Sequence, residues 1–170
     1  MASEWKGMSL FRRELMANLN ELLDAGIVPT SKLVLEQLIS NRGVLLSYSW
    51  MKADDRLFGM YVDMRSEGLR EMIFVRAGLN DEQLLKTLTH ELAHYFTLRR
   101  DTRLLGEKEY QEVERMADVL GNDLLETTNA VIASYHKKGH SPLEDGPQFG
   151  DLLGCIGKPT HRHKIQEVTQ

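Results

Sequence analysis

The segment from Leu79 to Phe96, "LNDEQLLKTLTHELAHYF", combines a helix start, an amphipathic repeat and a group of metal-binding side chains. Asn80 stands three residues before Gln83, a capping pattern that predicts a helix beginning next to it. Apolar residues then recur at three-to-four spacing, which gives the helix one face for burial. We therefore expect a helix over residues 81–99 that packs against the rest of the domain.

Two histidines and a glutamate lie in the middle of this expected helix. His90 and His94 are four residues apart, so on a helix their side chains project from one face, about 5–6 Å apart. This spacing lets both rings bind one Zn²⁺ at about 2.0–2.1 Å. Glu91 is rotated by about 100°, outside that coordination shell but within reach of a metal-bound water. The motif predicts two zinc ligands, His90 and His94, and a general base, Glu91.

A third ligand is expected from "EYQEVERMADVLG", residues 109–121, because catalytic zinc usually has three protein ligands and one open position. Glu114 is the best candidate, since Asp118 follows one turn later on the same face of a helix expected over residues 110–133. Asp118 would accept the free N–H of a ligand histidine and fix its tautomer. The competing acids lie nearer the connection and lack a paired acid at the fourth position: Glu107, Glu109 and Glu112.

The rest of the chain predicts an α+β domain. Amphipathic repeats indicate packing helices within residues 9–41, and three short β-prone runs within 43–77 predict an antiparallel three-stranded meander. With the two metal-site helices, these elements form one expected domain over residues 1–135. Residues 136–170 lose periodicity and contain three of the four prolines, so we expect an irregular tail there.

Composition excludes several classes of protein. The 21 basic and 25 acidic side chains give a net charge of −4, which provides no global attraction for nucleic acid. Cys155 is the only cysteine, so a disulfide framework and a multi-cysteine metal site are excluded. No apolar run is long enough to span a membrane, and the N-terminus lacks the pattern of a secretion signal. The expected location is the cytoplasm.

Two strings together resemble a known family: "HELAH", residues 90–94, and "ERMAD", residues 114–118. A His-Glu-x-x-His helix followed about twenty residues later by Glu-x-x-Ala-Asp is similar to zinc peptidases whose third ligand is a glutamate. Within these, residues 61–125 look most like the ImmA/IrrE metallopeptidases of bacteria and mobile elements. The resemblance implies a zincin-like fold, a zinc metalloendopeptidase activity, and a protein substrate such as a helix-turn-helix transcriptional repressor.

The resemblance also implies where a substrate would bind. In zincin-like folds a strand before the motif helix borders the cleft, and an extended peptide can pair with its free edge. The corresponding strand here would include Ile73, Phe74 and Val75. We expect a flexible protein segment as the substrate.

Some alternatives stay open at this point. The hydrogen-bond donor to the oxyanion could be one of four residues: Tyr110, Tyr135, His136 and His140. His161 and His163 are expected in the tail, and Cys155 has no visible catalytic partner. The main rival function is a regulatory protein with the same scaffold that binds a repressor without cutting it. A structural domain without metal is the third reading.

Overall fold

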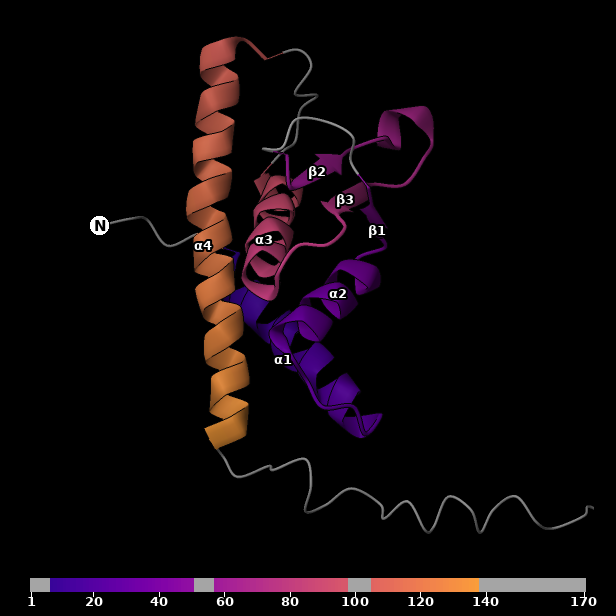
Figure 1. Ribbon diagram of the computed structural model, residues 1–170, viewed down its shortest axis with the longest axis vertical. Helices are drawn as coiled ribbons and strands as arrows, with labels where there is room; N and C mark the ends of the chain where they lie inside the picture. Colours follow the sequence, from indigo (N-terminus) through magenta and orange to yellow (C-terminus); the bar gives the residue numbers. More distant parts are fainter. Residues whose placement is uncertain (1–6, 51–56, 98–104, 138–170) are drawn as a thin grey trace, which may run out of the picture. The chain divides into compact units, whose positions relative to one another are not determined.

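The computed structural model describes residues 7–50, 57–97 and 105–137, which form four α-helices, one short 3₁₀-helix and a three-stranded sheet (Figure 1). In chain order the elements are α1 (Met8–Asp24), α2 (Ser31–Asn41), β1 (Leu45–Ser49), β2 (Gly59–Val62), η1 (Arg65–Glu67), β3 (Met72–Arg76), α3 (Asp81–Thr97) and α4 (Glu107–Lys137). The α+β class predicted from the sequence is confirmed.

The N-terminal helices form much of the core and are tied to α3. The Thr30 hydroxyl accepts the backbone N–H of Leu33 and begins α2. Arg42, just after α2, forms an ion pair of 2.5 Å with Glu14 on α1. The Arg42 guanidinium also lies 4.6 Å from the centre of the Phe96 ring at the end of α3. This residue therefore connects three helices through charge and ring contacts.

The sheet differs from the predicted antiparallel meander. Its strand order is β1-β3-β2; β2 and β3 are antiparallel, but β1 and β3 are parallel. The reason is burial: β3 carries Ile73 and Val75, both fully buried, and this apolar strand occupies the centre of the sheet. β2 is left as an edge strand, a position that its short length and exposed Met60 suit.

The two long helices closely match their predicted ranges. Asn80 accepts the N–H of Gln83 at 2.9 Å, and the Gln83 side chain accepts the N–H of Asn80 at 3.4 Å, which is the predicted capping box at the start of α3. α4 begins three residues earlier and ends four residues later than expected, so His136 is helical and not part of a tail. The last two residues of the first predicted helix, 98–99, lie outside the described residues. So do residues 138–170 of the predicted tail.

α3 lies between α4 on one side and strands β2 and β3 on the other (Figure 1). Its buried face includes Leu88, Leu92 and Ala93, all with no exposed surface. This central position fixes the orientation of the motif helix on both sides. None of the helices in the described part of the chain has the length and apolar character that a membrane span requires.

Candidate metal centre

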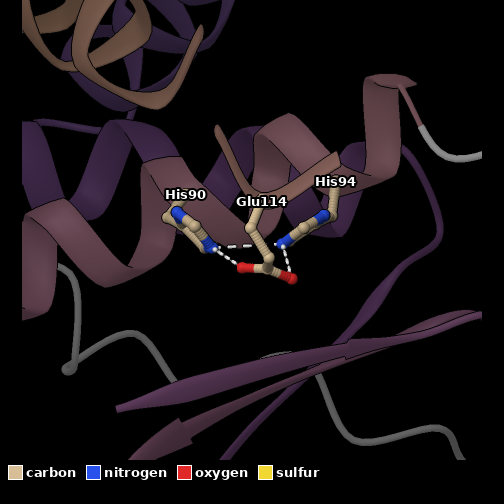
Figure 2. A group of neighbouring side chains, drawn as sticks. All are labelled: His90, His94 and Glu114. Atoms are coloured by element: carbon tan, nitrogen blue, oxygen red, sulfur yellow. Dashed lines mark hydrogen bonds and ion pairs between the residues drawn. The ribbon is translucent and has the colours of Figure 1, made fainter. Parts of the chain in front are cut away.

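Three of the residues predicted as metal ligands meet at one point (Figure 2). His90 and His94 project from α3, and the Glu114 carboxylate reaches between them from α4. The two Nε2 atoms are 3.1 Å apart. The Glu114 oxygens lie 3.3 Å from Nε2 of His90 and 3.5 Å from Nε2 of His94.

These separations fit a tetrahedral metal ion. Ligand atoms at about 2.0–2.1 Å from a tetrahedral centre are about 3.3–3.4 Å from one another, by the geometry of that coordination. The two nitrogens are separated by 3.1 Å, close to this value, and each nitrogen has a different oxygen of Glu114 at 3.3 or 3.5 Å. A His-His-Glu set with one open position is also a ligand set used for metal-assisted hydrolysis. His90, His94 and Glu114 could therefore hold one metal ion.

Asp118 lies next to one of the two histidines, His90. Its Oδ1 lies 3.0 Å from Nδ1 of His90, so it can accept the N–H there and leave Nε2 free to bind a metal. His94 is 6% exposed, and its burial lowers its pKa, which favours the neutral ring that a metal requires. Nδ1 of His94 is buried and has no hydrogen-bond partner among the described residues. The two rings are thus held differently.

Glu91 lies beside His90, His94 and Glu114 but is not part of that group. Its side chain is 5% exposed and lines the same cleft. Burial raises its pKa to about 8, the Glu114 carboxylate contributes in the same direction, and the backbone N–H of Tyr61 acts against them by donating a hydrogen bond. A carboxyl group with a pKa close to neutral can both accept and donate a proton, as a general base requires.

The site opens into a cleft of about 770 Å³ formed by α3, the first half of α4 and the segment around β2. Much of the β2 side is apolar and accessible: Leu57, Phe58 and Met60 are each between 38% and 44% exposed. Asp63 and Glu67 lie farther along the same wall. The cleft therefore combines the group of His90, His94 and Glu114 with one apolar wall, the usual character of a binding site.

The edge strand of this cleft is β2, not the predicted β3 segment. Ile73, Phe74 and Val75 are in the central strand, which pairs with β1 and β2 and has no free edge. The predicted free edge on this strand is wrong, because neighbours in a sheet cannot be read from the order of strands in the chain.

The backbone groups of β2 show which side faces the cleft. The N–H of Arg76 donates to the carbonyl of Phe58 at 2.8 Å, and in an antiparallel pair such bonded positions alternate. Gly59 and Tyr61 therefore point their N–H and C=O groups away from β3. Consistent with this, the Tyr61 N–H reaches Glu91 on α3.

Of the four open candidates for an oxyanion donor, Tyr110 is the one that the described structure places in the cleft. Burial, followed by the charge of the nearby Glu114 carboxylate, raises its pKa. Tyr135 and His136 are on α4 as well, but more than twenty residues from Glu114, which is about 32 Å along the helix. His140, His161, His163 and Cys155 lie outside the described residues.

Two glycines in the site were not predicted. A Cβ atom on Gly59 would lie 2.7 Å from Oε1 of Glu91, and one on Gly121 would lie 3.1 Å from Cα of His90. Both glycines line the cleft. The available signal for Gly121 was a glycine in the middle of a strong helical pattern, which often has a packing reason.

Three other acids near the start of α4 are exposed and lie outside the group of possible metal ligands: Glu107, Glu109 and Glu112. Their side chains instead make local contacts, such as the 2.6 Å ion pair of Glu112 with Arg115.

Comparison with known proteins adds no family assignment: no protein-family model matches the sequence, and no curated protein matches it.

Proposed function

We propose that the protein is a zinc-dependent endopeptidase with a zincin-like fold, similar to the ImmA/IrrE metallopeptidases. The observation that carries this proposal is the convergence of two Nε2 atoms and a carboxylate, with separations of 3.1–3.5 Å and a buried carboxyl group beside them. Two imidazoles and one carboxylate suit zinc, and the open position faces a cleft. His90, His94 and Glu114 would hold the ion.

Each residue of the site then has a separate role in peptide hydrolysis. Zinc held by these residues would supply a Lewis acid able to polarise the peptide carbonyl and to lower the pKa of a water molecule to about 7. Glu91 accepts the proton from that water and transfers it to the departing amine. Asp118 holds the ring of His90 in the tautomer that leaves Nε2 free. Tyr110, which lines the cleft, would donate a hydrogen bond to the oxyanion.

The shape of the cleft supports a protein segment as the substrate. β2 is an edge strand, and its residues from Gly59 to Val62 border the cleft, so an extended peptide can add to this edge through its backbone. The apolar wall from Leu57 to Met60 would receive an apolar side chain of that peptide. A helix-turn-helix repressor is the substrate that the family resemblance favours.

Incubation of the zinc-loaded protein with unfolded protein substrates and with helix-turn-helix repressors tests the proposal. Mass spectrometry should detect new peptide termini with the wild-type protein and none with Glu91→Gln, although both retain zinc. Equal cleavage by the Glu91→Gln protein would refute the mechanism. Stable repressor complexes without fragments would show a binding protein on the same scaffold.

A further inference from the structure

Gly121 lies on the same face of α4 as the two acids of the metal site. It follows Asp118 by three residues and Glu114 by seven, the spacing of side chains along one helical stripe. Glycine is among the least favourable residues in a helix interior, where alanine is the most favourable. Its presence at this buried position indicates that packing against a neighbour, and not helix stability, determines which residue stands there.

The close neighbours of Gly121 are backbone atoms of α3. A Cβ atom there would lie 3.1 Å from Cα of His90, 3.2 Å from N of His90 and 3.3 Å from the carbonyl carbon of Thr89. Flexible side chains can move away from such a contact, but a helix backbone moves only with the whole helix. Any side chain at this position therefore requires α4 to shift away from α3.

His90 consequently meets α4 at three places. Its backbone touches Gly121, its Nδ1 is 3.0 Å from Asp118, and its Nε2 is 3.3 Å from Glu114. We propose that Gly121 is a positioning residue of the metal site: its missing side chain sets the helix separation at which Glu114 and Asp118 reach His90. This inference rests on the proposed metal centre, but not on hydrolysis.

The tolerance of a metal site makes a small shift important. Metal–ligand distances vary by only about 0.2 Å in well-formed sites, and loss of a supporting hydrogen bond to a ligand histidine typically costs 10- to 100-fold in affinity. A shift of a few tenths of an ångström at Gly121 is of the same size as this tolerance. Glu114 and Asp118 move with it because they belong to the same rigid helix.

Zinc affinity of the Gly121→Ala protein, measured by competition with a chromophoric chelator, tests the inference. We expect affinity to fall by about tenfold or more, and the visible spectrum of the Co²⁺ form to change because its coordination is distorted. Gly106→Ala is the matched glycine control, since nothing lies within 4 Å of its added Cβ. Leu124→Ala controls for loss of stability, because Leu124 is fully buried on α4 but does not line the cleft.

A rescue variant separates positioning from general damage. In the Gly121→Ala background, Asp118→Glu adds one methylene group and should recover part of the lost affinity, whereas the same change in the wild-type background should weaken binding. Wild-type affinity and an unchanged Co²⁺ spectrum in a folded Gly121→Ala protein would overturn the inference while leaving the proposed function intact. An equal loss of affinity in Leu124→Ala would overturn it too. Absence of zinc binding by the wild-type protein would refute both.

Discussion

At the scale of single residues, the buried carboxyl group of Glu91 is the most informative feature. A glutamate that is 5% exposed is costly unless it is paired or has a function, because burial disfavours its charged form. The Tyr61 N–H is a single partner and does not offset that burial, so its pKa is raised to about 8. A purely structural helix would be more stable with an uncharged residue at this position.

The pH dependence of stability follows from this raised pKa. Between its ordinary value of 4.5 and about 8, the folded metal-free protein keeps a proton on Glu91 that the unfolded chain releases. This proton stabilises the folded state fully below about pH 4.5. The stabilisation is lost as pH rises from there through 8, by about 1.4 kcal/mol for each unit between the two pKa values. We expect Glu91→Gln to remove this loss, on the order of 3–5 kcal/mol.

Urea unfolding of the metal-free proteins from pH 5 to pH 8 checks this expectation. The lowered pKa of His94 has the opposite effect, since it favours the folded state as pH rises, but it is common to both proteins and cancels in the difference. Glu82→Gln is the control, an exposed glutamate on the same helix. Parallel pH profiles for the wild-type and Glu91→Gln proteins would contradict the assignment of a raised pKa.

At the scale of secondary structure, local signals predicted more than pairing did. The capping box of Asn80 and Gln83 and the apolar repeat after it are local, and they located α3 correctly. The four-residue spacing of His90 and His94 likewise depends only on helix geometry. Sheet order depends on which distant strands pair, and the sequence pattern of β3 is equally compatible with a central and an edge position. The free edge was therefore predicted on β3, whereas β3 is the central strand.

Contact between β2 and α3 gives a prediction for Gly59→Ala. The added Cβ would lie 2.5 Å from Cγ2 of Thr87 and 2.7 Å from Oε1 of Glu91, so β2 or the Glu91 side chain must move. Overpacking of this kind typically costs about 1–3 kcal/mol. We expect lower stability and a lower kcat, with zinc affinity retained because no metal ligand is among these contacts.

Urea unfolding, zinc titration and peptide hydrolysis of Gly59→Ala measure these three quantities. Gly106→Ala provides the control, as its added Cβ meets no atom within 4 Å. Wild-type turnover in Gly59→Ala would show that the close approach of β2 does not position Glu91.

At the scale of the whole molecule, the site joins two helices that are distant in sequence. α3 is held between the sheet and α4, and the core extends through α1 and α2 to both helices as one cluster. The spacing of Glu114 and Asp118 predicted that α4 would supply ligands, because both acids share a face. The separation of the helices could not be predicted in this way, since it depends on the packing of Gly121 against backbone atoms.

Metal binding should stabilise this assembly as a whole. An ion that binds only the folded state at a concentration of 100 times its Kd adds about 2.7 kcal/mol to the free energy of unfolding. Thermal unfolding should therefore shift to a higher Tm with Zn²⁺ and return after chelation. Mg²⁺ should have little effect, because it prefers a shell of oxygen ligands. A His94→Ala protein that gains as much from Zn²⁺ as the wild type would place the stabilising ion elsewhere.

The most direct test of the central claim is the metal content and coordination of the zinc-loaded protein, measured by elemental analysis and X-ray absorption spectroscopy. We expect one zinc per chain with two histidine nitrogens and one carboxylate oxygen from the protein. The same shell should persist in Glu91→Gln and be lost in His94→Ala. A wild-type protein without stoichiometric zinc, or a shell unchanged by His94→Ala, would contradict the metal centre formed by His90, His94 and Glu114.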